Sequence, residues 1–220
     1  MSGPGPGSSA EPSPAGAARA GEPVRRTVLA LGSNLGDRLA TLQGGVDALL
    51  GPSGPGSPGV DLSRPGSPGG GSSGLGSAGL ALVALSPVYE TVPVGGPPQP
   101  EYLNAVLIAE TALPPADLLR RAQAAEAAFG RVRQEVWGPR TLDVDVIVYG
   151  DVVSDDPELT LPHPRAQERA FVLAPWLDAD PDAEIPGQGR VAALLDAVVA
   201  RSGGQPGVRR LDDAQLRPPA

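Results

Sequence analysis

The sequence predicts an α+β domain, a ferredoxin-like sandwich in which helices pack on an antiparallel-rich sheet, and two observations lead there. Apolar runs of strand and helix character follow one another in the order β-α-β-β-α-β, interrupted by one insertion. Thirty glycines and twenty-seven prolines leave about 150 residues outside the low-complexity segments, a common size for one domain. Because the chain has no cysteine, it has neither a disulfide framework nor a thiolate metal site.

Composition also sets the expected domain boundaries. Residues 1–23 offer almost no apolar side chains to bury, so we expect a disordered tail. The folded domain is expected at residues 24–201, with a glycine- and serine-rich insertion at residues 51–79. Residues 202–220 are expected to form a second tail that needs no fold.

The first strand and helix are predicted on either side of a glycine-rich turn. Residues 24–31 are β-prone, and leucine and valine recur at helical spacing over residues 39–50. Asp37 stands where an N-cap is expected. The turn at residues 32–36 lacks the terminal Gly-Lys-Ser/Thr of a phosphate-binding Walker loop, so we interpret it as a plain strand-to-helix turn.

Two further strands and a helix follow the insertion. Residues 80–89 and 102–110 are apolar and β-prone, and the proline-rich connection between them is too long for a tight hairpin. Such a loop is often functional, although a passive connector fits it as well. The clearest helix covers residues 115–129, because proline opens it, an apolar stripe runs along it and Gly130 ends it.

The most informative segment carries two acids on one predicted strand. Asp143 and Asp145 alternate with valines, so the period of two places both carboxylates on one face and the valines on the other (Val144, Val146 and Val148). The Cα atoms of the two acids should lie about 6.6 Å apart, and two carboxylates that converge from there favour a bound cation such as Mg²⁺. An exposed strand face is the alternative.

Arginines precede this strand and point to phosphate chemistry. Arg131, Arg133 and Arg140 lie on the approach to Asp143, and Trp137 lies between them. Acids for a metal beside arginines for phosphate indicate phosphoryl-type transfer. The net charge of −8 argues against a protein that coats nucleic acid but allows a local basic pocket for a small anion.

The remaining polar residues have simple interpretations when each is considered by itself. Gln123 and Glu126 share one helix face, where solvated side chains are common. His163, the one histidine, lies between prolines and could cap a helix or contact an anion. After a turn and a short returning strand near residues 152–153, helices are predicted at residues 165–173 and 191–201. No signal segment and no run of eighteen apolar residues is found, so we expect a cytoplasmic protein without membrane contact.

Five segments of the chain together resemble the 6-hydroxymethyl-7,8-dihydropterin pyrophosphokinase family. They are residues 30–37 (ALGSNLGD), 86–91 (SPVYET), 102–105 (YLNA), 130–133 (GRVR) with 137–145 (WGPRTLDVD), and 161–164 (LPHP) with 169–171 (RAF). They stand in family order across nearly all of the foldable sequence. The resemblance implies transfer of diphosphate from ATP to 6-hydroxymethyl-7,8-dihydropterin, which yields AMP and the pterin diphosphate in folate biosynthesis.

The resemblance also implies a set of site residues. Asp143 and Asp145 would hold two Mg²⁺ ions on the ATP phosphates, and Arg131 and Arg140 would be catalytic. The residues implied for the nucleotide are Gln123, Glu126, Arg133, Trp137, Thr160, His163 and Arg169. The residues implied for the pterin pocket are Thr91, Tyr102, Asn104 and Phe171. We expect a monomer that binds these two substrates and no nucleic acid.

Two alternatives stay open at this point. A ferredoxin-like RNA-binding module could present bases on its sheet, although aromatic residues are 3% of the chain and no RNP-type motif occurs. A degenerate family member could bind MgATP without turnover, because three residues separate Arg133 from Trp137, one fewer than the family pattern. Formation of AMP that depends on the pterin would distinguish the enzyme from both.

Overall fold

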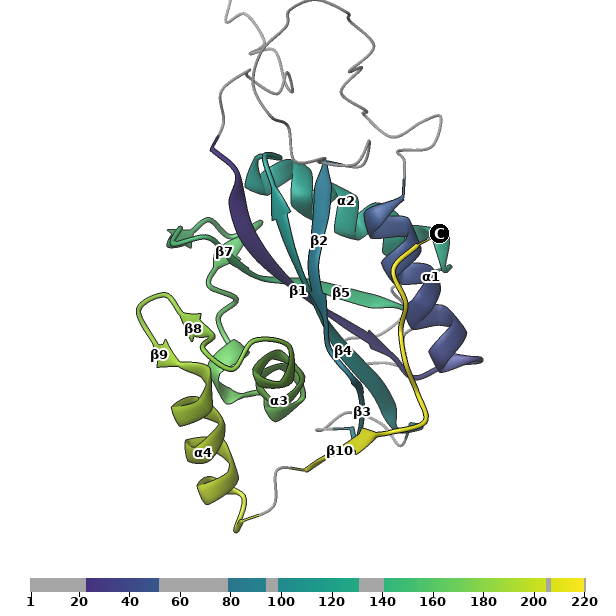
Figure 1. Cartoon of the computed structure of the whole chain (residues 1–220), viewed down its shortest axis with the longest axis vertical. Coiled ribbons are helices and arrows are strands. Elements are labelled where there is room, and N and C mark those ends of the chain that lie inside the picture. The colour runs from purple at the N-terminus through teal and green to yellow at the C-terminus, as the bar shows by residue number, and fades with distance from the viewer. Residues whose placement is uncertain (1–22, 52–78, 94–98, 131–140, 205–206, 220) are drawn as a thin grey trace, which may run out of the picture.

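The computed structural model describes residues 23–51, 79–93, 99–130, 141–204 and 207–219, which form one sheet with helices on both faces (Figure 1). The main strands are β1 (Arg25–Ser33), β2 (Leu80–Leu85), β3 (Val88–Thr91), β4 (Tyr102–Thr111), β5 (Asp143–Tyr149) and β10 (Val208–Leu211). The short strands are β6 (Ser154–Asp155) with β7 (Thr160–Leu161), and β8 (Glu184–Ile185) with β9 (Gly189–Arg190). The helices are α1 (Arg38–Leu50), α2 (Pro115–Ala128), the short 3₁₀ helix η1 (Ala166–Glu168), α3 (Ala170–Ala179) and α4 (Val191–Arg201).

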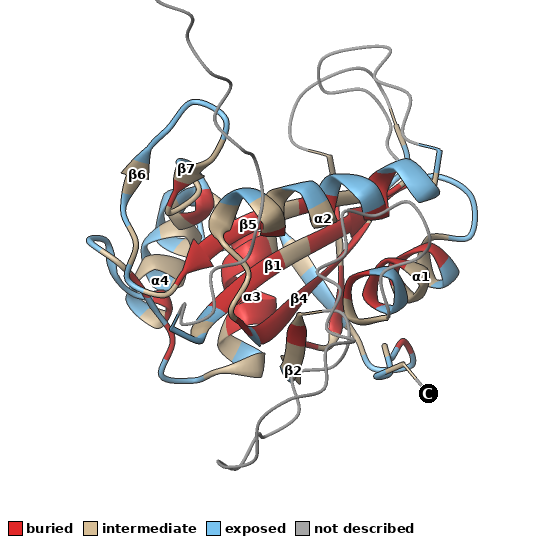
Figure 2. Cartoon of the chain, turned by 90° about the horizontal axis from the view of Figure 1, so that it is seen from above, coloured by how far each residue is buried: buried red, intermediate tan, exposed pale blue. Residues whose placement is uncertain are grey.

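The strand order confirms the predicted ferredoxin-like class. Within the described ranges the sheet runs β10-β3-β4-β1-β5, and β2 pairs with the other half of β4. Every pair in this sheet is antiparallel. The long strands β1 and β4 occupy the centre, where they are almost wholly buried. Figure 2 shows the buried residues concentrated along β1, β4 and β5.

Each face of the sheet has its own apolar core. Helices α1 and α2 cover one face, where Leu31 and Leu107 pack in the same cluster as Leu42 and Leu118. Helix α3 covers the other face and α4 packs against α3; the core there contains Ile108, Leu173 and Trp176, among others. Fully burying such side chains contributes about 2 kcal/mol each.

The helix signals in the sequence were good guides to α1, α2 and α4. The Asp37 carboxylate caps α1 by accepting a hydrogen bond from the Ala40 N–H at 3.0 Å. Helix α2 begins with Pro115, and Gly130 follows it with a φ of 73°, in the left-handed region that glycine favours. The helix predicted at residues 165–173 has the wrong bounds, because Arg169 is extended and separates η1 from α3.

Two strand predictions need correction. The run at residues 80–89 is two strands, because Ser86 and Pro87 interrupt it, and Pro87 has no N–H for the ladder. In β5, the register against β1 shifts so that Ile147 is an extra residue, and Val148 packs with Ile147 and Val28 rather than with the earlier valines. A bulge of this kind is not visible in the alternating sequence. Asp143 and Asp145 precede it and keep their common face.

The prediction that residues 202–220 need no fold is wrong for most of that segment. Strand β10 pairs with β3 at the sheet edge, and Ala214 is buried beyond it. The Gln43 side chain of α1 then exchanges two hydrogen bonds with the backbone of Arg217, both 2.9 Å long. Figure 1 shows this last segment (yellow) running from β3 along to α1.

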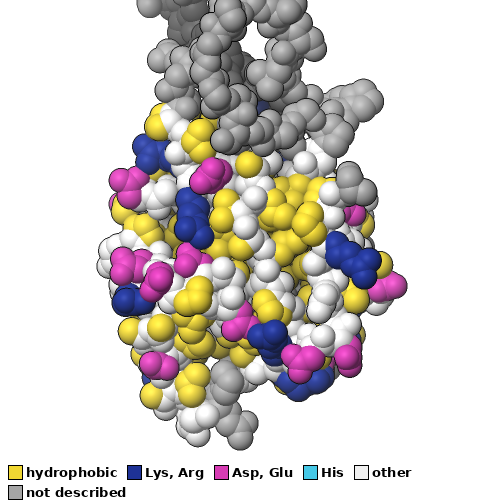
Figure 3. Space-filling view, viewed as in Figure 1, with side chains coloured by type: hydrophobic (Ala, Val, Ile, Leu, Met, Phe, Trp, Pro, Cys, Tyr) yellow, Lys and Arg dark blue, Asp and Glu magenta, His cyan; other side chains and the backbone are white. Residues whose placement is uncertain are grey.

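None of the described helices is long and apolar enough to cross a membrane. On the face shown in Figure 3, the described Arg side chains are interspersed with Asp and Glu and form no continuous basic area. This face therefore offers no extended surface for a polyanion.

Candidate active site

The predicted metal and pterin residues meet around one glycine at the end of the sheet. Gly32 of β1 lies opposite Asn104 of β4 on one side and Asp143 of β5 on the other. A Cβ atom at Gly32 would lie 3.4 Å from Asn104 Oδ1, 3.9 Å from Tyr102 Cδ1 and 4.0 Å from Asp143 Cβ. Glycine therefore leaves open the space that these three side chains surround.

Two side chains that are distant in the sequence lie beside Asp145, the cationic Arg169 and the titratable His163. Arg169 Nη1 donates a hydrogen bond to Asp145 Oδ2 at 3.1 Å, and His163 Nε2 lies 3.7 Å from the same oxygen. The backbone N–H of His163 donates to the Ile147 carbonyl at 2.8 Å, which fixes this loop against β5. The structure thus brings three of the predicted site residues together.

The pKa of His163 lies below its ordinary value. Burial of the imidazole is the main cause, and the nearby Arg169 adds to it, whereas the Asp145 carboxylate opposes it. The Arg165 N–H donates to His163 Nδ1 at 3.3 Å, so that atom is an acceptor. The neutral ring therefore carries its proton on Nε2, the nitrogen that faces Asp145.

Each of the predicted pterin residues has a defined contact in the structure. Asn104 Nδ2 donates to Thr91 Oγ1 at 2.9 Å, and both side chains are buried. The Tyr102 hydroxyl donates to Gln99 Oε1 at 3.1 Å. The Arg169 guanidinium lies 5.6 Å from the centre of the Phe171 ring. Phe171 therefore lies beside Arg169, the residue that contacts Asp145.

Sequence reasoning assigned Asn34 to a plain turn and missed its contacts. Asn34 is 1% exposed, and its Nδ2 donates to Gln99 Oε1 at 3.0 Å and to the Pro100 carbonyl at 3.3 Å. It therefore holds the chain just ahead of Tyr102. Asn34 lies in the segment 30–37, one of the five that carry the family resemblance, and this position could have indicated a role for it.

The predicted nucleotide residues on α2 and β7 differ in their positions. Glu126 is buried, and its Oε1 accepts a hydrogen bond from the Val144 N–H at 3.0 Å, between the two aspartates. Gln123 is exposed on α2. The Thr160 hydroxyl donates to the Asp156 carbonyl at 3.1 Å. Among the described residues, neither Gln123 nor Thr160 forms a hydrogen bond with Asp143 or Asp145.

The four predicted site residues on the approach to β5 lie outside the described residues; they are Arg131, Arg133, Trp137 and Arg140. Within the ranges that the structure covers, no group of three or more Asp, Glu, His or Cys residues is arranged to hold a metal. Two carboxylates with further oxygens from phosphate and water are nevertheless the usual donor set of Mg²⁺ beside a nucleotide. Asp143 and Asp145 fit that set.

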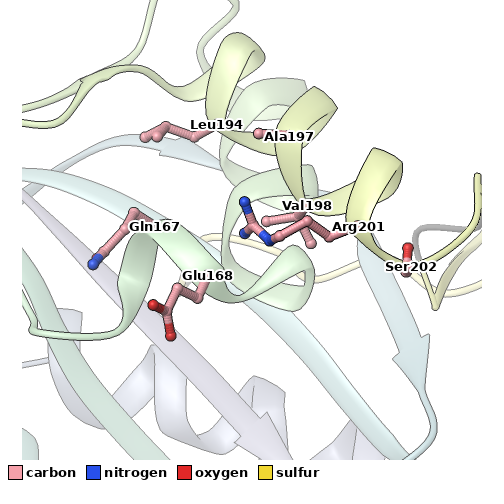
Figure 4. A pocket seen from close by; sticks show the side chains of 7 residues that line it. All are labelled: Gln167, Glu168, Leu194, Ala197, Val198, Arg201 and Ser202. Carbon is pink, nitrogen blue, oxygen red and sulfur yellow. The ribbon is translucent and has the colours of Figure 1, made fainter.

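A separate hollow of about 620 Å³ lies between η1 and α4 (Figure 4). Its lining consists of Gln167, Glu168, Leu194, Ala197, Val198, Arg201 and Ser202. None of the predicted site residues contributes to it. The end of the sheet that carries Asp143 and Asp145, rather than this hollow, is therefore the candidate active site.

The chain is similar to proteins of one known family. Residues 71–181 match the family model of 7,8-dihydro-6-hydroxymethylpterin-pyrophosphokinase (HPPK). The chain is 42% identical over 172 residues to the 2-amino-4-hydroxy-6-hydroxymethyldihydropteridine pyrophosphokinase of Mycobacterium tuberculosis (strain ATCC 25618 / H37Rv), with 74% of this chain and 76% of that protein covered. It is 37% identical to the enzyme of the same name from Pseudomonas aeruginosa, with 79% and 92% covered.

Solved structures support the fold. The Plasmodium falciparum HPPK-DHPS wild type with pterin and p-hydroxybenzoate superposes with a TM-score of 0.57 at 13% identity. The match covers 87% of this chain but 47% of that one, so this chain spans about half of the solved protein. At this identity the similarity concerns the fold alone.

Fold and relatives together define an ATP-dependent diphosphotransferase. The chain belongs to the 7,8-dihydro-6-hydroxymethylpterin-pyrophosphokinase family. It transfers diphosphate from ATP to 6-hydroxymethyl-7,8-dihydropterin, a step of folate biosynthesis. This confirms the resemblance.

Proposed function

We propose that the transfer takes place over Gly32, with the nucleotide on the Asp143 side and the pterin on the Asn104 side. The observation that carries the proposal is the position of Gly32 between these two residues. Gly32 separates the two predicted subsites by the width of one strand, so substrates bound there would lie next to each other. Holding two reactants in this way supplies much of the rate enhancement in phosphoryl-type transfer.

In the proposed step, the hydroxymethyl oxygen of the pterin forms a bond to the β-phosphorus of ATP. The bond from that phosphorus to the oxygen shared with the α-phosphate breaks, and AMP leaves with the electron pair while the hydroxyl proton is released. Positioning and charge neutralisation govern this chemistry. We assign no general base, because His163 is better suited to contact a phosphate.

Asp143 and Asp145 are the proposed ligands of two Mg²⁺ ions. When bound, Mg²⁺ neutralises phosphate charge and supports departure of AMP. The protein orients Asp145 through Arg169 and His163, and Glu126 fixes the backbone between the two aspartates. These contacts limit the movement of both carboxylates before any ligand arrives.

The remaining assignments follow the resemblance. Arg131 and Arg140 are proposed to be catalytic, with Gln123, Glu126, Arg133, Trp137, Thr160, His163 and Arg169 at the nucleotide. Thr91, Tyr102, Asn104 and Phe171 are proposed to bind the pterin, since an aromatic ring can stack on a flat heterocycle and an amide can read its edge. We propose a cytoplasmic monomer.

Counting bound metal ions tests the metal assignment. Mn²⁺ would replace Mg²⁺ in a titration of the protein with a non-hydrolysable ATP analogue and the pterin, followed by electron paramagnetic resonance. The proposal predicts two ions per chain and fewer in an Asp143→Asn variant. A single ion in both proteins would show that the aspartates do not hold a metal pair.

A further inference from the structure

An arginine on the far side of the sheet connects the two ends of the loop at residues 92–100. Arg38, the first residue of α1, uses one atom for two contacts. Its Nη1 donates to Glu90 Oε1 at 3.1 Å and to the Glu101 carbonyl at 2.8 Å. Glu90 directly precedes Thr91, and Glu101 directly precedes Tyr102. The contact therefore fixes the spacing of the two residues that bound the loop.

Glu90 is also held from the C-terminal strand. Arg209 of β10 pairs with Glu90 across the sheet edge, and its guanidinium forms an ion pair with the Glu90 carboxylate. The Glu90 side chain is 12% exposed. Burial raises the pKa of this carboxyl, but Arg209 and Arg38 outweigh burial and hold the pKa below its ordinary value. Glu90 is thus a charged junction between α1, β3 and β10.

The junction and the predicted pterin residues lie on opposite faces of the sheet. Glu90 is the cross-strand partner of Leu103, which packs in the core under α1 and α2. Thr91 is the partner of Tyr102 and accepts the hydrogen bond from Asn104 on the other face. Glu90 and Thr91 are successive strand residues, so their side chains lie on opposite faces and share one stretch of backbone. A change in the position of Glu90 therefore changes the position of Thr91.

We infer that Arg38, with Glu90 and Arg209, forms a positioning junction that sets the pterin pocket from behind the sheet. The inference rests on the proposed pterin site. Arg38 touches neither substrate; it fixes the backbone at Thr91 and Tyr102 so that these side chains and Asn104 converge on one ligand. Loss of the junction should weaken pterin binding selectively, because the aspartates on β5 are held by separate contacts with Arg169 and Glu126.

Steady-state kinetics on full-length variants test this inference. Arg38→Ala should raise the KM for the pterin about fivefold to twentyfold, the change expected when hydrogen bonds to a charged group are lost. The KM for ATP and kcat should stay within about twofold. Arg38→Lys should restore most of the pterin KM, because one ammonium can reach both acceptors that Nη1 now contacts. Arg209→Ala should produce a smaller shift in the same direction.

Two controls separate the possible failures. Arg26 lies on β1 and forms an exposed ion pair with Asp180. Arg26→Ala removes this pair and should change neither the KM for the pterin nor the KM for ATP. Asn104→Ala tests the pterin site itself and should raise the pterin KM strongly. If Asn104→Ala raises the KM for the pterin and Arg38→Ala does not, the junction has no positioning role. If neither variant changes it, the proposed pterin site is wrong. Equal increases in both KM values for Arg38→Ala would also overturn the inference.

Discussion

Glu126 Oε1 accepts a hydrogen bond from the backbone N–H of Val144, 3.0 Å away, so a buried carboxylate on α2 holds the residue between Asp143 and Asp145. Glu126→Ala should lower the free energy of unfolding by about 1–3 kcal/mol, because it leaves a buried N–H without its partner. Turnover should fall as well. Glu126→Gln keeps an acceptor oxygen and should retain more of both. Chemical denaturation with a rate assay checks this.

Glu110→Ala is the matched control, since Glu110 is an exposed acid on β4. It should change stability by less than about 0.5 kcal/mol. A Glu126→Ala protein as stable and as active as the Glu110→Ala protein would show that the bond to Val144 does not support the aspartates.

Removing either carboxylate of the aspartate pair should abolish turnover and leave the fold intact. Asp143→Asn and Asp145→Asn remove like-charged neighbours that serve a metal. Asp145 also loses its ion pair with the partly exposed Arg169, which is worth about 0–1 kcal/mol. Melting temperatures without Mg²⁺ should therefore stay close to that of the wild type. A variant that keeps the wild-type rate would contradict the metal assignment.

Arg121 provides the C-terminal cap of α1 from the neighbouring helix. Its guanidinium donates to the carbonyls of Leu49, Ala48 and Gly51 at 2.7, 3.1 and 2.6 Å. Arg121→Ala should cost about 1–3 kcal/mol, because these carbonyls have no N–H partner in the helix. The adjacent Arg120→Ala loses an exposed ion pair with Asp117 and should cost less than about 1 kcal/mol. Equal thermal shifts for the two variants would refute the capping role.

Deleting residues 52–77 with a short glycine-rich link in their place should preserve folding and activity. The two ends of this segment are anchored independently, Gly51 by Arg121 and Gly79 by the Thr111 hydroxyl, which donates to its carbonyl at 2.6 Å. Shortening a loop changes the closure entropy slowly, so stability should rise by at most about 1 kcal/mol. Loss of turnover in the deletion protein would mean that the segment contributes to the domain.

The lowered pKa of Glu90 predicts a specific dependence of stability on pH. Because the pKa is lower in the folded state than in the unfolded chain, the ionised carboxylate stabilises the fold above the ordinary pKa of 4.5. This stabilisation is lost as the pH falls through the folded-state pKa. Glu90→Gln should therefore melt below the wild type at pH 7, and the difference should shrink below pH 4.5. A difference that is constant from pH 7 to about pH 3 would contradict the ion-pair account.

The features that could be predicted from the sequence are those that depend on neighbouring residues. Asp37, Pro115 and Gly130 mark helix ends by their own chemistry, and the alternation at Asp143 and Asp145 fixes their common face before the bulge. Strand β10 escaped prediction because it lies between glycine- and proline-containing segments and is ordered by the edge of β3. Its pairing is a long-range contact that composition does not reveal.

The same distinction applies to the site. Residue types and spacing indicated a metal and a phosphate, but not the partners that fix them. The bonds from Asn34 to Gln99 and from Arg38 to Glu101 each join residues more than sixty positions apart. These bonds form because the start of α1 lies beside the connection between β3 and β4. The order of the strands in the sheet brings the two segments together, and neither segment's own sequence indicates it.

The decisive assay is AMP formation from MgATP by the wild-type protein, measured with and without 6-hydroxymethyl-7,8-dihydropterin. AMP should form only when the pterin is present, in equal amount to the pterin diphosphate, and Asp143→Asn should form none. A protein that binds MgATP but forms no AMP would be the degenerate family member that the short arginine segment allows. That result, or AMP formation independent of the pterin, would contradict the site described over Gly32.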